Sequence, residues 1–345
     1  MSAPGKITIG DVARHAGVSK GTVSLAFSGK RPVSEETRQR IFHAAEELNW
    51  TASHRARALA TSRTGAIGLV VARDPEVLAT DAFFSKFISG CERVLAEHDM
   101  GLMLHAVTTA EAEHLVYERL AAGRADGVIL LDVEIEDPRF ALVQRLGLPA
   151  VVLSAHEPTR GETGGLPTVY SDDSPAIAEL VALTAAAGHT RIAHVAGPTH
   201  YIHGRVRREA FSGAMREHGL EDSLVVEGDF TASSGRDATA QLLDLPEPPT
   251  AILYANDMMA IAGLSLARSR GLRVPEDLSL TGYDDSELSA HLSPALTTVS
   301  TGAAQRGELA VTTLLAALAG EELGAVLAAH TTVVPRGSIA PPLWS

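Results

Sequence analysis

The chain has 345 residues, of which 45% are hydrophobic, 29 are Lys or Arg and 42 are Asp or Glu. This length provides for two or three domains with a full-sized core, and the near-average hydrophobic content excludes wholesale disorder. No apolar run approaches the ~20 residues that a membrane-spanning helix needs, and the first ten residues hold no apolar core of signal-peptide length. Because the single cysteine, Cys91, cannot form an internal disulfide, we expect a protein of the reducing cytoplasm with no membrane partner.

The net charge of −13 is unevenly distributed along the chain. Residues 1–63 carry ten basic and five acidic side chains, a net charge of +5, which leaves −18 for the remainder. A basic segment joined to an acidic body is typical of a DNA-binding head on a separate regulatory body, although basic runs also occur on ordinary solvated surfaces.

Capping residues divide the N-terminal segment into three short helices. Thr8 is a good N-cap with Asp11 three residues later, and Gly17 can end that helix in the left-handed conformation. Ser19 and Ser34 are the expected N-caps of the second and third helices. Apolar residues recur at helical spacing in each segment, so the three helices can share a small core.

The residues Ala13, Gly17 and Val23 stand in the order that a helix-turn-helix requires. The small residue lets two helices approach, the glycine makes the turn, and the branched residue packs the second helix on the first. In such a motif the second helix lies in the major groove with its first turn facing base edges, and Ser19 and Thr22 are also suited to hold phosphates. The residues of this head that we expect to meet DNA are Thr8, Ser19, Lys20, Gly21, Thr22, Ser24, Leu25 and Ser28.

From residue 65 onward, short β-branched runs alternate with amphipathic helix patterns. The expected buried strands cover 67–71, 101–107, 127–131, 149–153, 191–197, 251–255 and 278–282. The expected helices cover 84–95, 111–122, 174–187, 205–218 and 257–270. Repeated βα units of this length predict an α/β body with two doubly wound parallel sheets.

Ligands of such sheets bind at the carboxyl ends of the strands, which selects a small set of loops. These loops are 72–84, 131–134, 154–156, 198–207, 256–257 and 283–285. Their arginine, asparagine and aspartates suit a small polyhydroxylated or similarly polar ligand. Taken singly, each also has a purely structural explanation, with Asp257 as a helix cap, Asp285 as an ion-pair partner and Arg207 as a surface charge.

Enzymatic and metal-binding patterns are weak. Asp284 and Asp285 are adjacent at a strand end and point to different sides, which does not suit a catalytic dyad. The sequence has no phosphate loop, no Gly-x-Ser-x-Gly elbow and no Cys-x-x-Cys pair. One histidine-rich stretch lacks the i, i+4 helical spacing of a zinc protease; it consists of His189, His194, His200 and His203. We therefore expect no catalytic residue, no cofactor and no metal.

A family resemblance begins in the head, where residues 8–48 read TIGDVARHAGVSKGTVSLAFSGKRPVSEETRQRIFHAAEEL. This segment resembles the lactose-repressor/galactose-repressor family of bacterial transcription regulators, and the likeness continues through a hinge-helix motif at 56–59 and covers essentially the whole chain. The resemblance implies that Leu59 is pushed into the minor groove at the operator centre, as an apolar wedge that bends DNA, and it places Arg57 at the DNA interface as well. Leu25 stands where many relatives have arginine, and it can contact a thymine methyl but cannot pair with guanine.

The resemblance also implies a set of effector contacts in the body, namely Phe83, Phe84, Ser154, Arg207, Asn256, Asp284 and Thr301. Arg207 lies in Arg-Arg-Glu-Ala-Phe, which is similar to the motif whose arginine clamps the effector in the family. Ser154 and Thr301 stand where relatives carry an aspartate and a longer polar side chain, a departure from the usual sugar-hydroxyl pattern.

These observations predict a cytoplasmic transcriptional regulator in the role of a repressor, which acts as a homodimer on a pseudo-palindromic operator and responds to a sugar or similar polar metabolite. The expected domains are a helix-turn-helix head at 1–52, a hinge helix at 53–64 and a body at 65–345, with an N-subdomain at about 65–165 plus 299–327 and a C-subdomain at about 166–298 plus 328–345. The alternatives are a solute-binding protein without a regulatory role and, more distantly, an enzyme on a Rossmann-like fold. The sequence leaves open the effector, the direction of its effect, the operator and whether dimers pair into tetramers.

Overall fold

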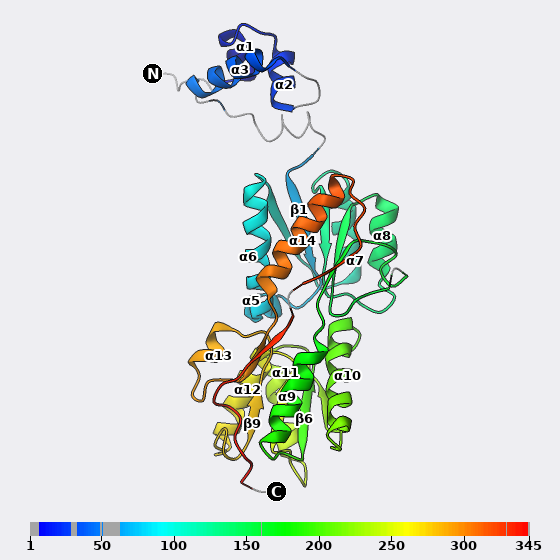
Figure 1. The fold of residues 1–345 in the computed structure, drawn as a ribbon, viewed down its shortest axis with the longest axis vertical. Coiled ribbons are helices and arrows are strands. Elements are labelled where there is room, and N and C mark those ends of the chain that lie inside the picture. Colours follow the sequence, from blue (N-terminus) through cyan, green and yellow to red (C-terminus); the bar gives the residue numbers. More distant parts are fainter. Residues whose placement is uncertain are drawn as a thin grey trace.

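The computed structural model describes residues 7–28, 33–48, 50, 63–159, 161–328 and 330–343. Within these ranges the chain forms a small helical head and an α/β body with two lobes (Figure 1). We call the lobe built on the six-stranded sheet the N-lobe and the lobe built on the four-stranded sheet the C-lobe. Among the described helices, none has both the length and the apolar character needed to cross a bilayer.

The head consists of α1 (Ile9–His15), α2 (Lys20–Ser28) and α3 (Glu35–Glu47). The expected caps are confirmed, because Asp11 accepts a hydrogen bond from the backbone of Thr8 at 2.9 Å and Ser34 accepts one from the backbone of Thr37. Gly17 joins α1 to α2 with a φ of 67°, a conformation that favours glycine. The buried core of the head is formed by Val12, Ala13, Ala16, Val23, Ala26, Ile41, Ala44 and Ala45.

The N-lobe sheet is entirely parallel, with the strand order β11-β5-β4-β3-β1-β2. Its strands are β1 (Ala66–Val71), β2 (Gly101–Ala106), β3 (Gly127–Leu130), β4 (Ala150–Ser154), β5 (Thr168–Tyr170) and β11 (Ala325–Leu327). Its helices are α5 (Pro75–Thr80), α6 (Ala82–Glu97), α7 (Ala110–Ala121), α8 (Pro138–Leu146) and α14 (Ala303–Leu318). Strands β1, β3 and β4 are almost wholly buried, as expected where helices cover a parallel sheet.

The C-lobe sheet is also parallel, with the order β7-β6-β8-β9. Its strands are β6 (Ile192–Ala196), β7 (Val225–Glu227), β8 (Ala251–Tyr254) and β9 (Ser279–Thr281). Its helices are α9 (Ser174–Ala186), α10 (Ile202–Glu217), α11 (Ala232–Leu243), α12 (Asp257–Ser269) and α13 (Glu287–His291). The expectation of two doubly wound parallel sheets is therefore confirmed.

Within the described residues, the chain passes between the lobes at three places. The crossings lie between β5 and α9, between β10 (Thr298–Ser300) and α14, and between β11 and β12 (Thr332–Val334). Strands β10 and β12 pair as a small antiparallel ribbon, and Thr331 donates a hydrogen bond to the carbonyl of Asp172, which ties the third crossing to the first. Because β5 pairs with β4, the first crossing follows Tyr170, slightly beyond the boundary expected near residue 166.

Helix α14 returns to the N-lobe after the C-lobe is complete and packs along α6 (Figure 1). Two glycines make this contact close. A Cβ on Gly90 would overlap the backbone carbonyl of Ala304, and a Cβ on Gly307 would overlap the carbonyl of Phe87. The start of α14, and with it the second crossing, is therefore fixed against the N-lobe.

Candidate functional site

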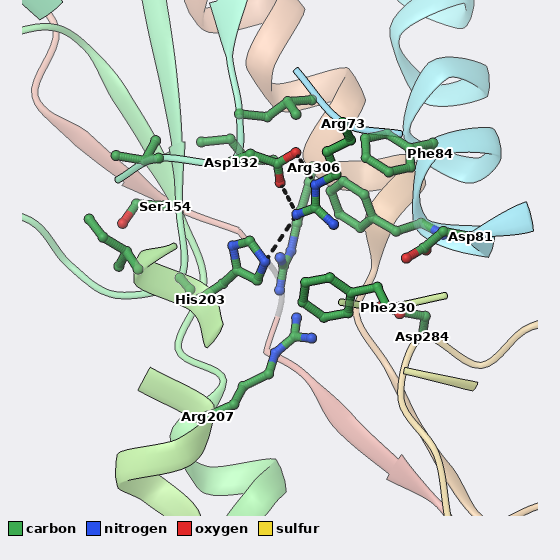
Figure 2. A pocket seen from close by; sticks show the side chains of 16 residues that line it. Arg73, Asp81, Phe84, Asp132, Ser154, His203, Arg207, Phe230, Asp284 and Arg306 are labelled. Carbon is green, nitrogen blue, oxygen red and sulfur yellow. Dashed lines mark hydrogen bonds and ion pairs between the residues drawn. The ribbon is translucent and has the colours of Figure 1, made fainter. Parts of the chain in front are cut away.

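A hollow lies between the lobes, where the loops after β1, β3 and β4 meet residues of the C-lobe (Figure 2). Its enclosed space is about 60 Å³, and about 600 Å³ of space is present when the open solvent at its mouth is included. The aromatic rings of Phe83, Phe84 and Phe230 contribute to its apolar wall. Its charged wall residues are Arg73, Asp81, Asp132, Arg207, Asp284 and Arg306.

Arg73 follows β1 and joins the two lobes across this hollow (Figure 2). Its Nε and Nη2 donate to the two carboxylate oxygens of Asp132 at 2.6 and 2.5 Å, and Nη2 also lies 3.2 Å from Nε2 of His203 in the C-lobe. The guanidinium carbon is 4.7 Å from the ring centroids of both Tyr201 and Phe230, which is within cation–π range. One N-lobe cation is thus held by both lobes.

The protonation states of this cluster follow from burial and charge. Burial and the adjacent cation of Arg73 lower the pKa of His203 to about 3, so the imidazole is neutral at physiological pH. Burial alone would raise the pKa of Asp132, but the charge and hydrogen bonds of Arg73, together with neighbouring charges, outweigh burial and lower the pKa. A neutral His203 can accept the hydrogen bond from Arg73, and the Arg73–Asp132 pair carries no net charge.

Asp173 lies on the first crossing and binds two arginines. It accepts a hydrogen bond from Arg207 Nε at 2.9 Å and another from Arg306 Nη2 at 3.1 Å. Arg207 on α10 also donates to the carbonyl of Ala255, and its guanidinium carbon lies 3.7 Å from the ring centroid of Tyr283. Burial would raise the pKa of Asp173, but the two arginines hold it well below its usual range. The C-lobe and the first turn of α14 therefore meet at one ionised carboxylate.

Asn256 is placed beside this hollow rather than on its wall. Its side-chain oxygen caps α12 by accepting from the backbone of Met259 at 2.9 Å. Its amide nitrogen donates to Asp81 at 3.3 Å and to the carbonyl of Phe230 at 3.0 Å. Asn256 lines a smaller adjoining hollow, together with Asp81 and Asp284. In this geometry it contributes by positioning Asp81 of the opposite lobe.

The other residues expected at the effector site divide into two groups. Phe83, Phe84, Ser154, Arg207 and Asp284 all line the hollow between the lobes. Thr301 does not; it lies on the second crossing, where its buried hydroxyl has no hydrogen-bond partner among the described residues. The structure thus brings Arg207 and Asp284 to one pocket from α10 and from the loop after β9.

The bonding partners of Arg207, Asp257 and Asp285 show which of the purely structural roles considered for them hold. Arg207 is 6% exposed, so it is no surface charge, and its ion pair is with Asp173. Asp257 accepts hydrogen bonds from the backbone of Ser286 and from the hydroxyls of Ser289 and Thr298, a structural role within the C-lobe. Asp285 pairs with Arg336 at 2.6 Å, as the ion-pair explanation expects.

Several wall residues had no assigned role in the sequence-based prediction. Arg73, Asp132 and His203 fall within the strand-end loops that topology selects, but polarity alone does not show which loop residues turn inward. Asp173 and Arg306 lie at lobe crossings, outside those loops, and only the return of α14 to the N-lobe brings them together. Among the described residues, no group of His, Cys, Asp and Glu is arranged to hold a metal ion.

The head presents the first turn of α2 as a candidate DNA interface. Thr8, Ser19, Lys20 and Gly21 are exposed, and Thr22, Ser24 and Leu25 are half-buried. Ser19 Oγ accepts from the backbone N–H of Thr22 at 3.0 Å, so it caps α2. Three other residues expected at the DNA lie beyond what is described: Arg57 and Leu59 of the expected hinge, and the side chain of Ser28.

Comparison with known proteins identifies both parts of the chain. Residues 8–53 match the family model described as bacterial regulatory proteins, lacI family, and residues 181–339 match a periplasmic binding protein-like domain. The ribose operon repressor of Escherichia coli (strain K12) is 34% identical over 322 residues, covering 89% of this chain and 92% of that protein. The transcriptional repressor CytR of the same organism is 32% identical, covering 92% of this chain and 91% of that protein.

Solved structures agree with this relationship. The lac repressor dimer bound to operator and the anti-inducer ONPF has a TM-score of 0.81 at 28% identity, covering 97% of this chain and 99% of that chain. The complex of the transcriptional regulator CelR with cellobiose has a TM-score of 0.72 at 29% identity, covering 96% of this chain and all of that one. Because the similarity extends through head and body, the rival assignments of a solute-binding protein without a regulatory role and of an enzyme are set aside. The chain belongs to the lacI family of bacterial regulatory proteins.

Proposed function

We propose that the protein is a cytoplasmic transcriptional repressor whose cleft binds a sugar or similar polar metabolite, and whose operator affinity depends on that binding. Residues 1–52 form the DNA-binding head, residues 53–64 the hinge helix, and the remainder the effector-binding and dimerisation body. The protein acts as a homodimer, so its two heads read a pseudo-palindromic operator.

The observation that carries this proposal is the composition of the cleft. Donors from Arg207 and Arg306 and acceptors from Asp81 and Asp284 line one hollow, beside the aromatic ring of Phe230. A sugar hydroxyl both donates and accepts hydrogen bonds, and the C–H faces of a sugar ring suit an apolar wall. Two relatives support this choice of ligand class, since one is a ribose operon repressor and another was solved with cellobiose.

The three crossings supply a physical route from the cleft to the head. Arg207 of the C-lobe and Arg306 of α14 share Asp173 on the first crossing, so a ligand that moves either arginine acts on the joint between the lobes. A change in the angle between lobes alters how the N-lobes of a dimer face each other, and with them the hinges to the heads. By linkage, operator DNA and effector then change each other's affinity by the same factor.

A two-stage experiment tests this function. Thermal unfolding is first measured with D-ribose, cellobiose and a panel of other neutral sugars and nucleosides, because a specific ligand raises the unfolding temperature by mass action. Fluorescence anisotropy then measures binding to an operator selected from a random DNA library, with and without the stabilising sugar. We expect a sugar that stabilises the protein also to change operator affinity. A sugar that stabilises the protein but leaves operator affinity unchanged contradicts the proposed regulation.

A further inference from the structure

Two carboxyl groups from opposite lobes share the cleft without a cation of their own. Asp81 caps α6 in the N-lobe, and Asp284 follows β9 in the C-lobe. Both line the main hollow and the smaller adjoining one, and they are 8% and 5% exposed (Figure 2). Neither takes part in an ion pair among the described residues, unlike Asp132 and Asp173 on the same cleft.

The hydrogen bonds of these two groups differ. Asp81 accepts from the backbone of Phe83 at 2.9 Å and from Asn256 at 3.3 Å. The carboxylate of Asp284 accepts no hydrogen bond from any described residue; its backbone alone is bonded, to Val299 and Lys86. Asp284 also has a φ of 93°, a conformation that non-glycine residues rarely adopt and that is found where function requires it. Its carboxyl group is therefore presented to the cavity at a cost in backbone strain.

The cations around the pair are all bound by other groups. Arg73 is bound by Asp132, and Arg207 and Arg306 are both bound by Asp173. The ammonium group of Lys86 contacts the backbone carbonyls of Asp284 and Asp285 rather than a carboxylate. Among the charges that act on Asp284, Arg207 lowers its pKa, whereas Asp81, Asp257 and Asp173 raise it.

Two buried carboxyls in this setting do not both ionise. Burial, followed by repulsion from Asp81, raises the pKa of Asp284 well above its usual range, and burial also raises the pKa of Asp81. With one proton on the pair, the three arginines of the cleft are balanced by Asp132, Asp173 and the single remaining charge. The cleft then has no surplus positive charge for an anionic ligand.

Arg306 offers an unused donor to the hollow. It is 4% exposed, and its Nε–H has no hydrogen-bond partner among the described residues although the side chain lines the hollow. A buried donor without a partner is costly, which indicates that a bound molecule supplies the acceptor. The cleft thus pairs a donor wall, formed by Arg306 and Arg207, with an acceptor wall, formed by Asp81 and Asp284.

We propose that Asp81 and Asp284 form a carboxyl pair that holds one proton between the lobes and selects an uncharged, hydroxyl-bearing effector, excluding phosphorylated sugars. One hydroxyl donates to the pair, and another oxygen of the same molecule accepts from Arg306 and Arg207. This selectivity rests on the proposed sugar-binding function, whereas the proton held by the pair is a property of the protein without any effector.

The proposed proton on the Asp81–Asp284 pair is tested with the full-length protein in the absence of any effector. Unfolding is measured in urea between pH 5 and 8 for the wild type, D81N and D284N, with D237N, at an exposed position on α11, as the matched control. A proton bound by the folded protein and lost on unfolding raises the unfolding equilibrium constant about tenfold per pH unit. Because buried histidines such as His203 act in the opposite direction below about pH 6.5, the slopes are compared between proteins. We expect the logarithm of the unfolding constant to rise with pH more steeply, by about one unit per pH unit, in the wild type and D237N than in D81N and D284N. If the unfolding constant depends on pH equally in all four proteins, the proposal that the pair holds a proton is overturned.

The selectivity is tested by thermal shift with matched probes, D-ribose against D-ribose 5-phosphate and D-glucose against D-glucose 6-phosphate, within a wider panel of sugars and their phosphates. We expect stabilisation by a neutral sugar and none by its phosphate. Stabilisation by a phosphate in preference to its parent sugar overturns the selectivity. If no sugar stabilises the protein, the proposed sugar-binding function fails, and the urea measurement still decides whether the pair holds a proton.

Discussion

The side chains of Arg73 and His203, which belong to opposite lobes, meet at 3.2 Å inside the cleft. Asp132 of the N-lobe fixes Arg73 by two further hydrogen bonds, so this cation reaches the C-lobe in a defined orientation. The lobes are therefore held together by side chains of the protein itself, and an effector acts on a joint that is already structured. Substitutions in this joint should change both stability and the response to effector.

Replacing Arg73 with alanine should destabilise the protein by about 3–5 kcal/mol, because it leaves Asp132 buried without its counter-ion. Urea unfolding measures the change. The double variant R73A/D132N should recover part of the loss, since it no longer buries an unpaired charge. A double variant as unstable as the sum of its single variants would show that the two residues do not interact.

His203 should make the protein sensitive to acid. Its pKa is about 3 in the folded protein, below its ordinary value of about 6.5, so the unfolded chain takes up a proton that the folded protein does not. This contribution to stability is present above about pH 6.5 and is lost as the pH falls toward 3. Urea unfolding between pH 7 and 4 should therefore show a shallower loss of stability in H203Q than in the wild type. The control H218Q, at the exposed position directly after α10, should behave as wild type; equal slopes in H203Q and H218Q would refute the role of His203.

Operator binding should depend steeply on salt. Residues 1–63 carry a net charge of +5 and the remainder −18, so phosphate contacts by the head dominate the favourable electrostatics. Anisotropy measured between 50 and 200 mM salt should show affinity falling by orders of magnitude, at least about a hundredfold. Effector binding to the charge-balanced cleft should change little over the same range. An operator affinity that does not depend on salt would contradict the assignment of the head.

Leu59 falls in the expected hinge segment, outside the described residues, and its role as a minor-groove wedge is a prediction from the family resemblance. The L59A variant should lose operator affinity and DNA bending, because the bend is maintained by contacts that the wedge permits. Bending is measured by energy transfer between dyes at the two ends of the operator, and sugar binding serves as the control. An unaltered bend in L59A would show that the residue only packs within the hinge.

Much of the architecture is predictable from local patterns. The seven expected strands and five expected helices are all present because β-branched runs and amphipathic spacing are strong local signals. Strands β5, β7, β10, β11 and β12 have three residues each, too short for a periodic pattern, and their pairing is set by tertiary contacts. The caps at Thr8, Ser19 and Ser34 were predictable because capping chemistry is local.

The cleft was less predictable than the fold. The loops that line it follow from topology, and five of the seven expected effector residues lie on its wall. The partner of Arg207 was not predictable, because Asp173 lies 34 positions away and is brought near by the first crossing. Asn256 has the expected residue type in the expected loop, yet its oxygen is used by the cap of α12, a competition between local and functional hydrogen bonds.

The central claim is that a sugar bound at Arg207 controls the head. The most direct test compares operator affinity with and without a stabilising sugar in the wild type, in R207A and in the matched control R208A, whose arginine is the exposed neighbour on α10. R207A removes the donor that Asp173 orients toward the cleft, while the head is untouched. We predict that R207A binds the operator with near wild-type affinity but loses the response to sugar by at least about tenfold in sugar concentration, whereas R208A responds normally. A folded R207A that responds to the sugar at the wild-type concentration would contradict the account.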